Sequence, residues 1–230
     1  MDIKQNIKIA VDAIVFGYSN HQLHVLLVQQ KYGPMQGQWV LVGGFVHDDE
    51  SLQAAVEREL REETGLIVNY LEQLYTFGDD VHRDPRMRVV SVAYFALVNS
   101  TELSPRADTD AAEAQWFPID QLPTLGYDHE HILEVARQRL KNKLTYQPIG
   151  FDLLPEYFLF SDLENLYCSI LRQEIDRRNF RKKILSFGFL EETDQISKRN
   201  AGRPAKFFRF NKLKYNQLQK AGFLFEIKFA

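Results

Sequence analysis

The chain has 230 residues and a formal net charge of −3, and 45% of its residues are hydrophobic. This length suffices for one large or two small domains with a substantial core. No apolar run approaches the roughly 18 residues of a membrane-spanning helix, and the first residues do not follow the pattern of a secretory signal peptide. We therefore expect a cytoplasmic protein without a membrane partner. The single cysteine, Cys168, cannot form an internal disulfide, so the sequence indicates no redox chemistry.

The charge is distributed unevenly along the chain. Residues 1–150 carry 13 Lys or Arg and 21 Asp or Glu, a net charge of −8, whereas residues 151–230 carry 15 and 10, a net charge of +5. Such a difference indicates two units with different partners, of which the basic one faces a polyanion. Solubility alone also produces such differences, so the asymmetry by itself is a weak indication.

The first 45 residues show the alternation of apolar and polar side chains that is typical of strands. The elements predicted here are strands at residues 7–15 and 23–27, a loop at 31–38 and a short apolar strand at 39–42. The short strand leads into the glycine pair Gly43 and Gly44, which predicts a turn.

The residues that follow carry signals for a short helix. Ser51 is a residue that caps helix N-termini, the residues from Leu52 to Thr64 include no Gly or Pro, and Gly65 stands where a left-handed residue ends a helix. The pattern predicts a helix over residues 52–64, in which Val56 and Leu60 form an apolar stripe that packs on a sheet.

Three carboxylates share one face of this predicted helix. At 100° per residue, Glu59, Glu62 and Glu63 fall within an arc of about 100°. Like charges at this spacing repel by roughly 0.2–0.5 kcal/mol per pair. A hard divalent cation, Mg²⁺ or Mn²⁺, reverses the sign of this interaction and takes oxygen ligands. We therefore favour a metal site over the alternative, a solvated acidic surface.

A charged loop is expected at residues 78–88, between predicted strands at 67–77 and 89–98. Because arginine forms bidentate bonds to phosphate oxygens, Arg83, Arg86 and Arg88 are candidates for gripping a diphosphate; the alternative is a solvated loop. Another short strand is expected to end at residues 116–118, before a helix at 132–144. His129 and His131 fit the entry of this helix better than a zinc site, because no cysteine lies nearby.

The second part of the chain predicts two helices and a two-stranded wing. A boundary is expected near residues 146–154, after which Ser161 and Glu164 form a capping box for a helix that ends near Arg172. A second helix is expected from Glu174 to Leu185, and apolar runs at 187–190 and 207–210 flank the wing. The alternating residues at 223–229 predict a further strand that has no place in this arrangement.

This basic region has the composition of a surface that follows phosphates. Between Arg172 and Lys220 there are 14 basic and 5 acidic residues. A second helix that follows a capped one is the arrangement in which a helix enters the major groove of duplex DNA. We therefore expect DNA contacts from the second helix and the wing, made by Arg177, Arg178, Asn179, Arg181, Lys182, Arg203 and Lys206.

The segment from Gly44 to Leu66, GFVHDDESLQAAVERELREETGL, is identified as a Nudix box without a gap. Residues from about 5 to 145 resemble a Nudix hydrolase domain, and the phrases GGFV, RDPR, SVAY and WFP resemble its ADP-ribose pyrophosphatase branch. The remainder resembles the winged-helix domain of the Nudix-related transcriptional regulators, through RRNFRKKI at 177–184 and GRPAKFFRF at 202–210.

This resemblance implies an α+β fold: a Nudix αβα sandwich with a mixed sheet over residues 1–148, followed by a winged helix-turn-helix domain over residues 149–230. It implies a homodimer that reads a palindromic operator, and an effector that is ADP-ribose or a sugar such as arabinose. The site residues that it implies are Glu59, Glu62 and Glu63 as metal ligands, Arg58 as their partner, and Gly43, Gly44 and Phe45 beside the substrate. Val42 departs from the pattern, since the enzymes commonly have Pro there.

Two functions from different classes follow. In the first, the protein is a transcriptional regulator whose Nudix domain senses a nucleotide or sugar. In the second, it is a metal-dependent pyrophosphohydrolase, for which the resemblance implies cleavage of ADP-ribose to AMP and ribose 5-phosphate. Glu62 or Glu63 is then the base, and a further acid from Asp108 to Glu113 is left open. The basic second part favours the regulator, and the intact box favours the hydrolase. We place the regulator first, with residual hydrolysis left open.

Overall fold

The computed structural model describes residues 5–100, 111–197 and 204–229. The chain forms two compact units, the first of Met1–Ser19 with Leu23–Gln138 and the second of Asn20–Gln22 with Arg139–Ala230. Within the described residues, no helix is long and apolar enough to cross a membrane. The boundary between residues 148 and 149 stays a prediction, because this division falls inside a helix that begins at His129.

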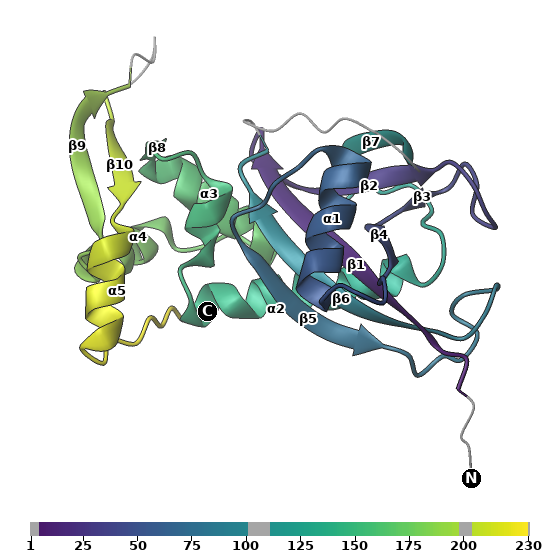
Figure 1. Cartoon of the computed structure of the whole chain (residues 1–230). Coiled ribbons are helices and arrows are strands. Elements are labelled where there is room, and N and C mark those ends of the chain that lie inside the picture. Colours follow the sequence, from purple (N-terminus) through teal and green to yellow (C-terminus); the bar gives the residue numbers. More distant parts are fainter. Residues whose placement is uncertain (1–4, 101–110, 198–203, 230) are drawn as a thin grey trace. The chain divides into compact units, whose positions relative to one another are not determined.

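The first unit is built on a mixed sheet (Figure 1). The strand order is β3-β2-β1-β6-β5, with β4 paired to β1 and β7 paired to β2. Strands β1 and β6 are parallel, whereas β4 and β5 run antiparallel to their neighbours. The strands are β1 (Lys8–Ser19), β2 (Gln22–Gln30), β3 (Trp39–Val40), β4 (Val42–Phe45), β5 (Leu71–Phe77), β6 (Val89–Val98) and β7 (Ala111–Pro118).

Helix α1 (Leu52–Thr64) lies across one face of this sheet (Figure 1). Its bounds confirm the prediction, and the predicted signals act as expected: the Ser51 hydroxyl accepts a hydrogen bond from the Ala54 N–H at 3.1 Å, and Gly65 adopts the left-handed φ of 70°. Val56 and Leu60 are fully buried against the sheet, and of the three predicted carboxylates Glu63 is buried whereas the Glu62 side chain is 46% exposed.

The second unit contains the predicted helices and wing. Its elements are the end of α2 (His129–Tyr146), a 3₁₀ turn η1 (Ile149–Leu153), β8 (Phe158–Leu159), α3 (Phe160–Leu171), α4 (Arg177–Ser186), β9 (Leu190–Ile196), β10 (Lys206–Phe210) and α5 (Lys212–Lys220). The strand order β8-β10-β9 places the wing hairpin beside the strand that enters α3. The expected α+β class and the winged arrangement are confirmed.

The predicted starts of both helices in this unit are wrong by one to three residues. The Asp162 carboxylate accepts a hydrogen bond from the Leu159 N–H at 3.0 Å, so α3 begins at Phe160 and Ser161 is not its cap. The Asp176 carboxylate accepts from the Asn179 N–H at 3.0 Å, so α4 begins at Arg177 rather than at Glu174. In both places a nearby acidic residue supplies the cap.

The strand predicted at residues 223–229 is also wrong. This segment pairs with no described strand; its backbone bonds run from the Phe223 N–H to the Leu218 carbonyl at 2.9 Å and from the Ile227 N–H to the Thr145 carbonyl at 2.8 Å. Its residues nevertheless alternate between buried and exposed positions, because one side packs on the second unit. The alternation of apolar and polar residues therefore indicates that one side of this segment is buried, although the segment is not part of a sheet. Helix α5 was not predicted; the Asn211 side chain caps it by accepting from the Lys214 N–H.

Candidate functional site

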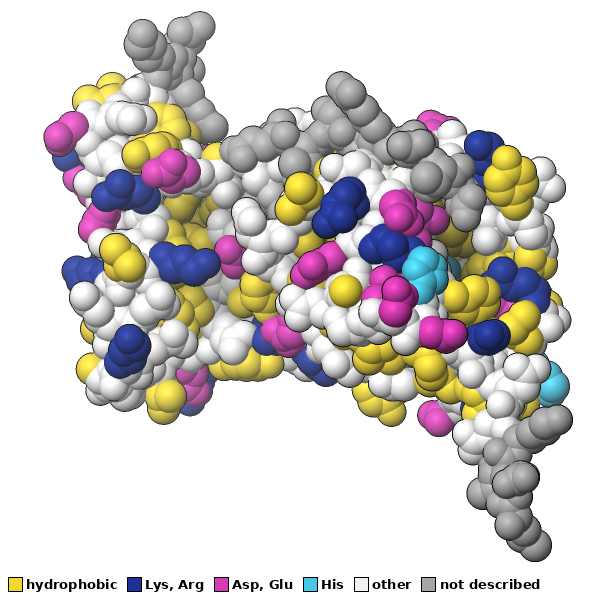
Figure 2. All heavy atoms as spheres, viewed as in Figure 1, with side chains coloured by type: hydrophobic (Ala, Val, Ile, Leu, Met, Phe, Trp, Pro, Cys, Tyr) yellow, Lys and Arg dark blue, Asp and Glu magenta, His cyan; other side chains and the backbone are white. Residues whose placement is uncertain are grey.

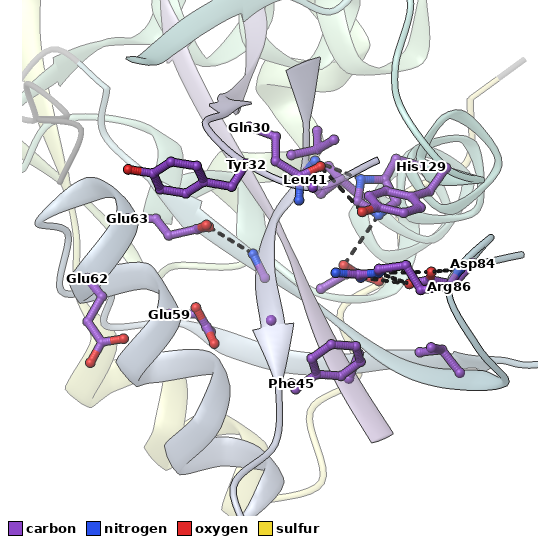
Figure 3. A pocket seen from close by; sticks show the side chains of 18 of the residues that line it. Gln30, Tyr32, Leu41, Phe45, Glu59, Glu62, Glu63, Asp84, Arg86 and His129 are labelled. Carbon is purple, nitrogen blue, oxygen red and sulfur yellow. Dashed lines mark hydrogen bonds and ion pairs between the residues drawn. The ribbon is translucent and has the colours of Figure 1, made fainter. Parts of the chain in front are cut away.

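A cavity of about 470 Å³ opens on the first unit between α1, β4, the loop before β6 and the residues that lead into α2. On the face that carries α1, acidic and basic side chains gather together with a histidine (Figure 2). Glu59, Glu62 and Glu63 line one wall, and Figure 3 shows Glu59 and Glu63 pointing toward β4 while Glu62 lies farther from it. The predicted carboxylates thus share one cavity.

Arg58 holds these carboxylates. Its guanidinium donates to Glu59 at 2.7 Å, to Glu62 at 3.2 Å and to Glu50 at 2.6 Å. The hydrogen bonds from Arg58 hold the pKa of Glu50 at about 2. Burial raises the pKa of Glu59, and the bond from Arg58 opposes that shift only in part. Burial thus disfavours the charged form of Glu59, and a nearby cation would stabilise that form.

The two glycines of β4 are required for different reasons. A Cβ at Gly43 would overlap the backbone carbonyl of Val11 on the neighbouring strand, whereas a Cβ at Gly44 would overlap the carboxylate of Glu59. The Gly43 N–H also donates to the Glu63 carboxylate at 3.0 Å (Figure 3). Gly43 thus allows the sheet to close, and Gly44 leaves space for a carboxylate of the cavity.

A buried polar network forms the opposite wall. Arg83 donates to both carboxylate oxygens of Asp128, at 2.6 and 2.8 Å, and lies 3.6 Å from Asp12. Ser91 donates to the Asp12 carboxylate. Burial lowers the pKa of Arg83, but the bonds to Asp128 and the charge of Asp12 raise it overall. The Arg83 guanidinium is therefore charged and already paired, rather than free for a ligand.

His129 joins this network to the strands. Its Nδ1 accepts a hydrogen bond from the Leu41 N–H at 2.9 Å, and its Nε2 lies 3.5 Å from Asp12. Burial lowers the pKa of His129, so the ring is neutral at pH 7. Because Nδ1 is an acceptor, the ring proton is on Nε2 and points at Asp12. His129 therefore fixes the backbone between β3 and β4, and it begins α2.

Arg86 is held between aromatic rings. Its guanidinium carbon lies 5.1 Å from the ring centre of Phe45 and 5.7 Å from that of Tyr127, and Asp84 accepts from it at 2.7 Å. Burial raises the pKa of Asp84, but the bonds from Arg86 lower it overall. Arg86 and Phe45 both line the cavity (Figure 3), and their contact with a substrate stays a prediction.

Arg88 departs from the expected arrangement. It is not among the residues that line the cavity, and its guanidinium donates to the carbonyls of Gly78 at 2.6 Å and Asp80 at 3.1 Å. Arg88 therefore closes the charged loop on itself, and the geometry gives no support to a substrate contact. Among the acidic residues at 108–113 that were considered as bases, Asp108 and Asp110 lie outside the described residues, and Glu113 is exposed and does not line the cavity.

The charge of the cavity favours a cation. Of the described lining residues, five are acidic and three are arginines, and each arginine donates to a carboxylate. The oxygen donors fit Mg²⁺ or Mn²⁺ in chemistry. The described residues nevertheless contain no ready group of three His, Cys, Asp or Glu side chains that would hold a metal. The carboxylates of α1 share the cavity, but Arg58 and the Gly43 N–H occupy them.

The second unit presents a basic helix. Phe180 and Ile184 of α4 are buried, and at 3.6 residues per turn Arg178 and Lys182 lie on the opposite, exposed face. Arg177 instead pairs with Glu164 at 3.5 Å and donates to Asn165. The predicted DNA-binding residues therefore form two groups. Arg178 and Lys182 lie on the outward face of α4, whereas residues such as Arg177 are exposed but paired with other side chains of the domain.

Arg181 belongs to the second group. Its guanidinium lies 4.3 Å from the ring centre of Phe160 and 5.4 Å from that of Phe208, which joins α4 to α3 and to the wing. Asn179 donates to Asp176 at 2.7 Å, and Lys206 pairs with Glu192 at 2.7 Å. Arg203, the other predicted wing contact, lies outside the described residues.

Sequence reasoning missed Asp12 and Tyr127, and it gave His129 no site role. A usable signal existed for Asp12, because it is the one charged residue within the apolar run from Ile9 to Phe16. Tyr127 gave no such signal; it adopts a positive φ of 54° and reaches the cavity only through the fold.

Residues 7–137 match the NUDIX domain family, and residues 150–210 match the NrtR DNA-binding winged helix domain. The chain therefore belongs to the Nudix family, as a Nudix domain joined to a winged-helix domain. Within this class it is a homologue of the NrtR transcriptional repressors. It is 36% identical over 204 residues to the ADPR responsive transcriptional repressor NtrR of Acinetobacter baylyi, over 87% of this chain and 80% of the relative.

Solved structures agree with this assignment. The crystal structure of Shewanella oneidensis NrtR complexed with a 27mer DNA matches with a TM-score of 0.76 and 32% identity, over 96% of this chain and 99% of that chain. The NUDIX domain of the same protein complexed with ADP ribose matches with a TM-score of 0.55 and 38% identity, over 60% of this chain and 90% of that chain. An ADP-ribose pyrophosphatase of Methanocaldococcus jannaschii is 40% identical over 128 residues, which are 55% of this chain and 70% of the relative.

The two glycines allow a paired test of the cavity. Gly43→Ala places a Cβ against a backbone oxygen that cannot move away, so we expect it to destabilise the first unit by about 1–3 kcal/mol in urea unfolding. Gly44→Ala places its Cβ against the end of a flexible side chain. We expect it to leave stability nearly unchanged and to weaken Mn²⁺ binding, measured by titration calorimetry, because Glu59 is displaced. Equal Mn²⁺ affinity in Gly44→Ala and wild type would contradict this reading.

Proposed function

We propose that the protein is a DNA-binding transcriptional repressor whose Nudix domain binds ADP-ribose or a related nucleotide or sugar, together with Mg²⁺ or Mn²⁺. The observation that carries this proposal is the outward basic face of α4 in a chain that also carries the arginine- and carboxylate-lined cavity. The relatives named above support it, since one is an ADPR responsive repressor and another was crystallised with DNA. We place its action in the cytoplasm.

The DNA-binding part of the proposal rests on α4. Its exposed face carries Arg178 and Lys182, and Asn179 stands beside them near the N-terminus of the helix, where recognition helices meet base edges. Lys206 adds a charge on the wing. We propose that Arg178 and Lys182 meet DNA, that Arg177 and Arg181 keep α4 in place, and that the protein acts as a homodimer on a palindromic operator.

Salt dependence separates these two roles. We expect Arg178→Ala and Lys182→Ala each to reduce the slope of log affinity against log salt concentration by about 1.8, because each substitution removes one phosphate contact, of about 0.9, from each protomer of the homodimer. Lys141→Ala, an exposed residue of α2, is the control for a lost charge outside α4. The measurement is fluorescence anisotropy with an operator duplex over a range of salt. Equal slopes for Arg178→Ala, Lys182→Ala and Lys141→Ala would remove α4 from the DNA surface.

The effector part rests on the charge of the cavity. A diphosphate brought in alone meets more carboxylates than arginines, so a divalent cation is needed to offset the repulsion. Arg83 and Arg86 stand on the opposite wall from the α1 carboxylates, where phosphate oxygens can exchange with Asp128 and Asp84. We propose that the effector binds with its cation between these two walls.

This arrangement gives two linked expectations. ADP-ribose at 100 times its Kd is expected to stabilise the protein by about 2.7 kcal/mol in a thermal shift assay with Mg²⁺, and by less in EDTA. NAD and arabinose in the same assay distinguish the related effectors.

Saturating effector is expected to change the Kd for the operator by 5- to 150-fold, as a typical coupling of about 1–3 kcal/mol. One operator Kd with and without effector would reject the coupling.

Hydrolysis is the second candidate function, favoured by the presence of Arg58, Glu59, Glu62 and Glu63 and by the likeness to an ADP-ribose pyrophosphatase. When bound, the metal would lower the pKa of a water and neutralise phosphate charge. In this structure the Gly43 N–H holds Glu63, whereas the Glu62 side chain is half exposed beside Arg58. The two candidate bases therefore differ in surroundings: Glu63 accepts from the strand backbone and Glu62 pairs with Arg58.

The assay for this function measures AMP release from ADP-ribose with Mg²⁺ and with Mn²⁺. For an active site, we expect Glu62→Gln to lower turnover by about 10²–10⁴-fold if Glu62 is the base. Glu57→Gln removes the same charge from the far side of α1 and is the control. Absence of turnover with both metals, or turnover that persists when Glu62 and Glu63 are both replaced by Gln, removes the hydrolase and leaves a sensor.

A further inference from the structure

The segment from Phe223 to Phe229, here named the C-terminal strap, lies beyond the part of the chain that matches the winged-helix family, which ends at residue 210. It forms no strand, but its side chains alternate sharply: Phe225 and Ile227 are 5% and 4% exposed, whereas Leu224 is 84% exposed. The alternating apolar side chains of the strap therefore pack within the second unit.

The strap contacts α4 near both of its ends. At the C-terminal end, the ring of Phe225 lies 5.0 Å from that of Phe187, the C-cap residue of α4, and Phe223 lies 5.3 Å from the same ring. In the N-terminal half, the ring of Phe229 lies 6.3 Å from that of Phe180. Residues of the strap and of α4, with Phe229 and Phe180 among them, also line a groove of about 520 Å³.

The strap also reaches the elements that support α4. Phe229 lies 5.8 Å from Tyr167 of α3, which is fully buried and lies 4.7 Å from Phe180. The hydroxyl of Tyr167 has no hydrogen-bond partner among the described residues, so this side chain is held through its ring. The Ile227 N–H donates to the Thr145 carbonyl at the end of α2. The strap is thus tied to α2, α3 and α4 at once.

Helix α4 buries little of its own apolar surface, so its orientation also depends on the contacts made by neighbouring segments. It has ten residues, of which only Phe180 and Ile184 are buried, and a helix of this length is marginal without tertiary packing. We propose that the C-terminal strap is a positioning element for the DNA-binding helix: Phe229 and Phe225 fix its two ends, so that the exposed face of α4 meets the groove of the operator at the right angle. This inference rests on the proposed DNA-binding function.

The test compares full-length Phe229→Ala and Phe225→Ala with Leu224→Ala, the exposed neighbour. The DNA is the duplex that the wild-type chain selects from a random library, and a scrambled duplex of equal length. We expect both Phe variants to bind the selected duplex about tenfold more weakly and the scrambled duplex nearly unchanged, because base contacts need orientation whereas phosphate attraction does not. Leu224→Ala is expected to match wild type, and Phe229→Leu to restore most of the affinity.

Two results would overturn the proposal. One is unchanged affinity of both Phe variants for the selected duplex; the other is an equal loss on both duplexes together with a loss of helical circular dichroism, which would mark unfolding. Hydrogen exchange without DNA keeps the test independent of the proposed function. There, Phe229→Ala should speed the exchange of the α4 amides, while ADP-ribose binding with Mg²⁺ stays as in wild type. If no duplex is selected, the proposed function fails, and the exchange result alone decides the role of the strap.

Discussion

The guanidinium of Arg58 is the interaction on which the cavity depends. It donates to a residue before α1, to two carboxylates of α1 and to a carbonyl of β4, namely Glu50, Glu59, Glu62 and Phe45. The positively charged guanidinium thereby sets the distance between α1 and β4. It also neutralises carboxylates that would otherwise repel each other within a half-buried wall. Removing it would leave those charges uncompensated, which costs more than the pairs themselves contribute. The Nudix box therefore holds this wall together through contacts within the protein.

The two units show different ways of fixing a functional surface. In the first, buried polar groups satisfy one another, as His129 does between Leu41 and Asp12, and directional bonds leave little freedom in where a carboxylate can lie. In the second, the supports of α4 are aromatic rings and the guanidinium of Arg181 on Phe160. Ring packing is less directional than a hydrogen bond, so the orientation of α4 depends on contacts at several points rather than on one.

The sequence predicted well those elements that depend on residues close together in the chain. The helix at 52–64 follows from Ser51, Gly65 and an unbroken run between them, and the structure confirms it. The predicted start of α4 at Glu174 was wrong because Asp176 caps the helix, its carboxylate accepting from the Asn179 N–H. The pairing of Asp12 with Arg83, and the burial of the strap, join residues far apart in the chain. No local pattern encodes such contacts, although a lone charge in an apolar run marked one of them.

The pairing of every arginine in the cavity wall constrains how the protein can respond to a ligand. A phosphate that takes the place of Asp128 on Arg83, or of Asp84 on Arg86, exchanges one ion pair for another, so an accompanying cation would add to the net attraction. A ligand shifts an equilibrium only by the difference in its affinity for two arrangements. Replacing the Arg83–Asp128 ion pair would give the ligand such a difference in affinity, because this pair joins two segments. Asp128 directly precedes α2, and Arg83 belongs to a loop between strands. The ion pair that a phosphate would replace is the one that fastens this loop to the first turn of the helix.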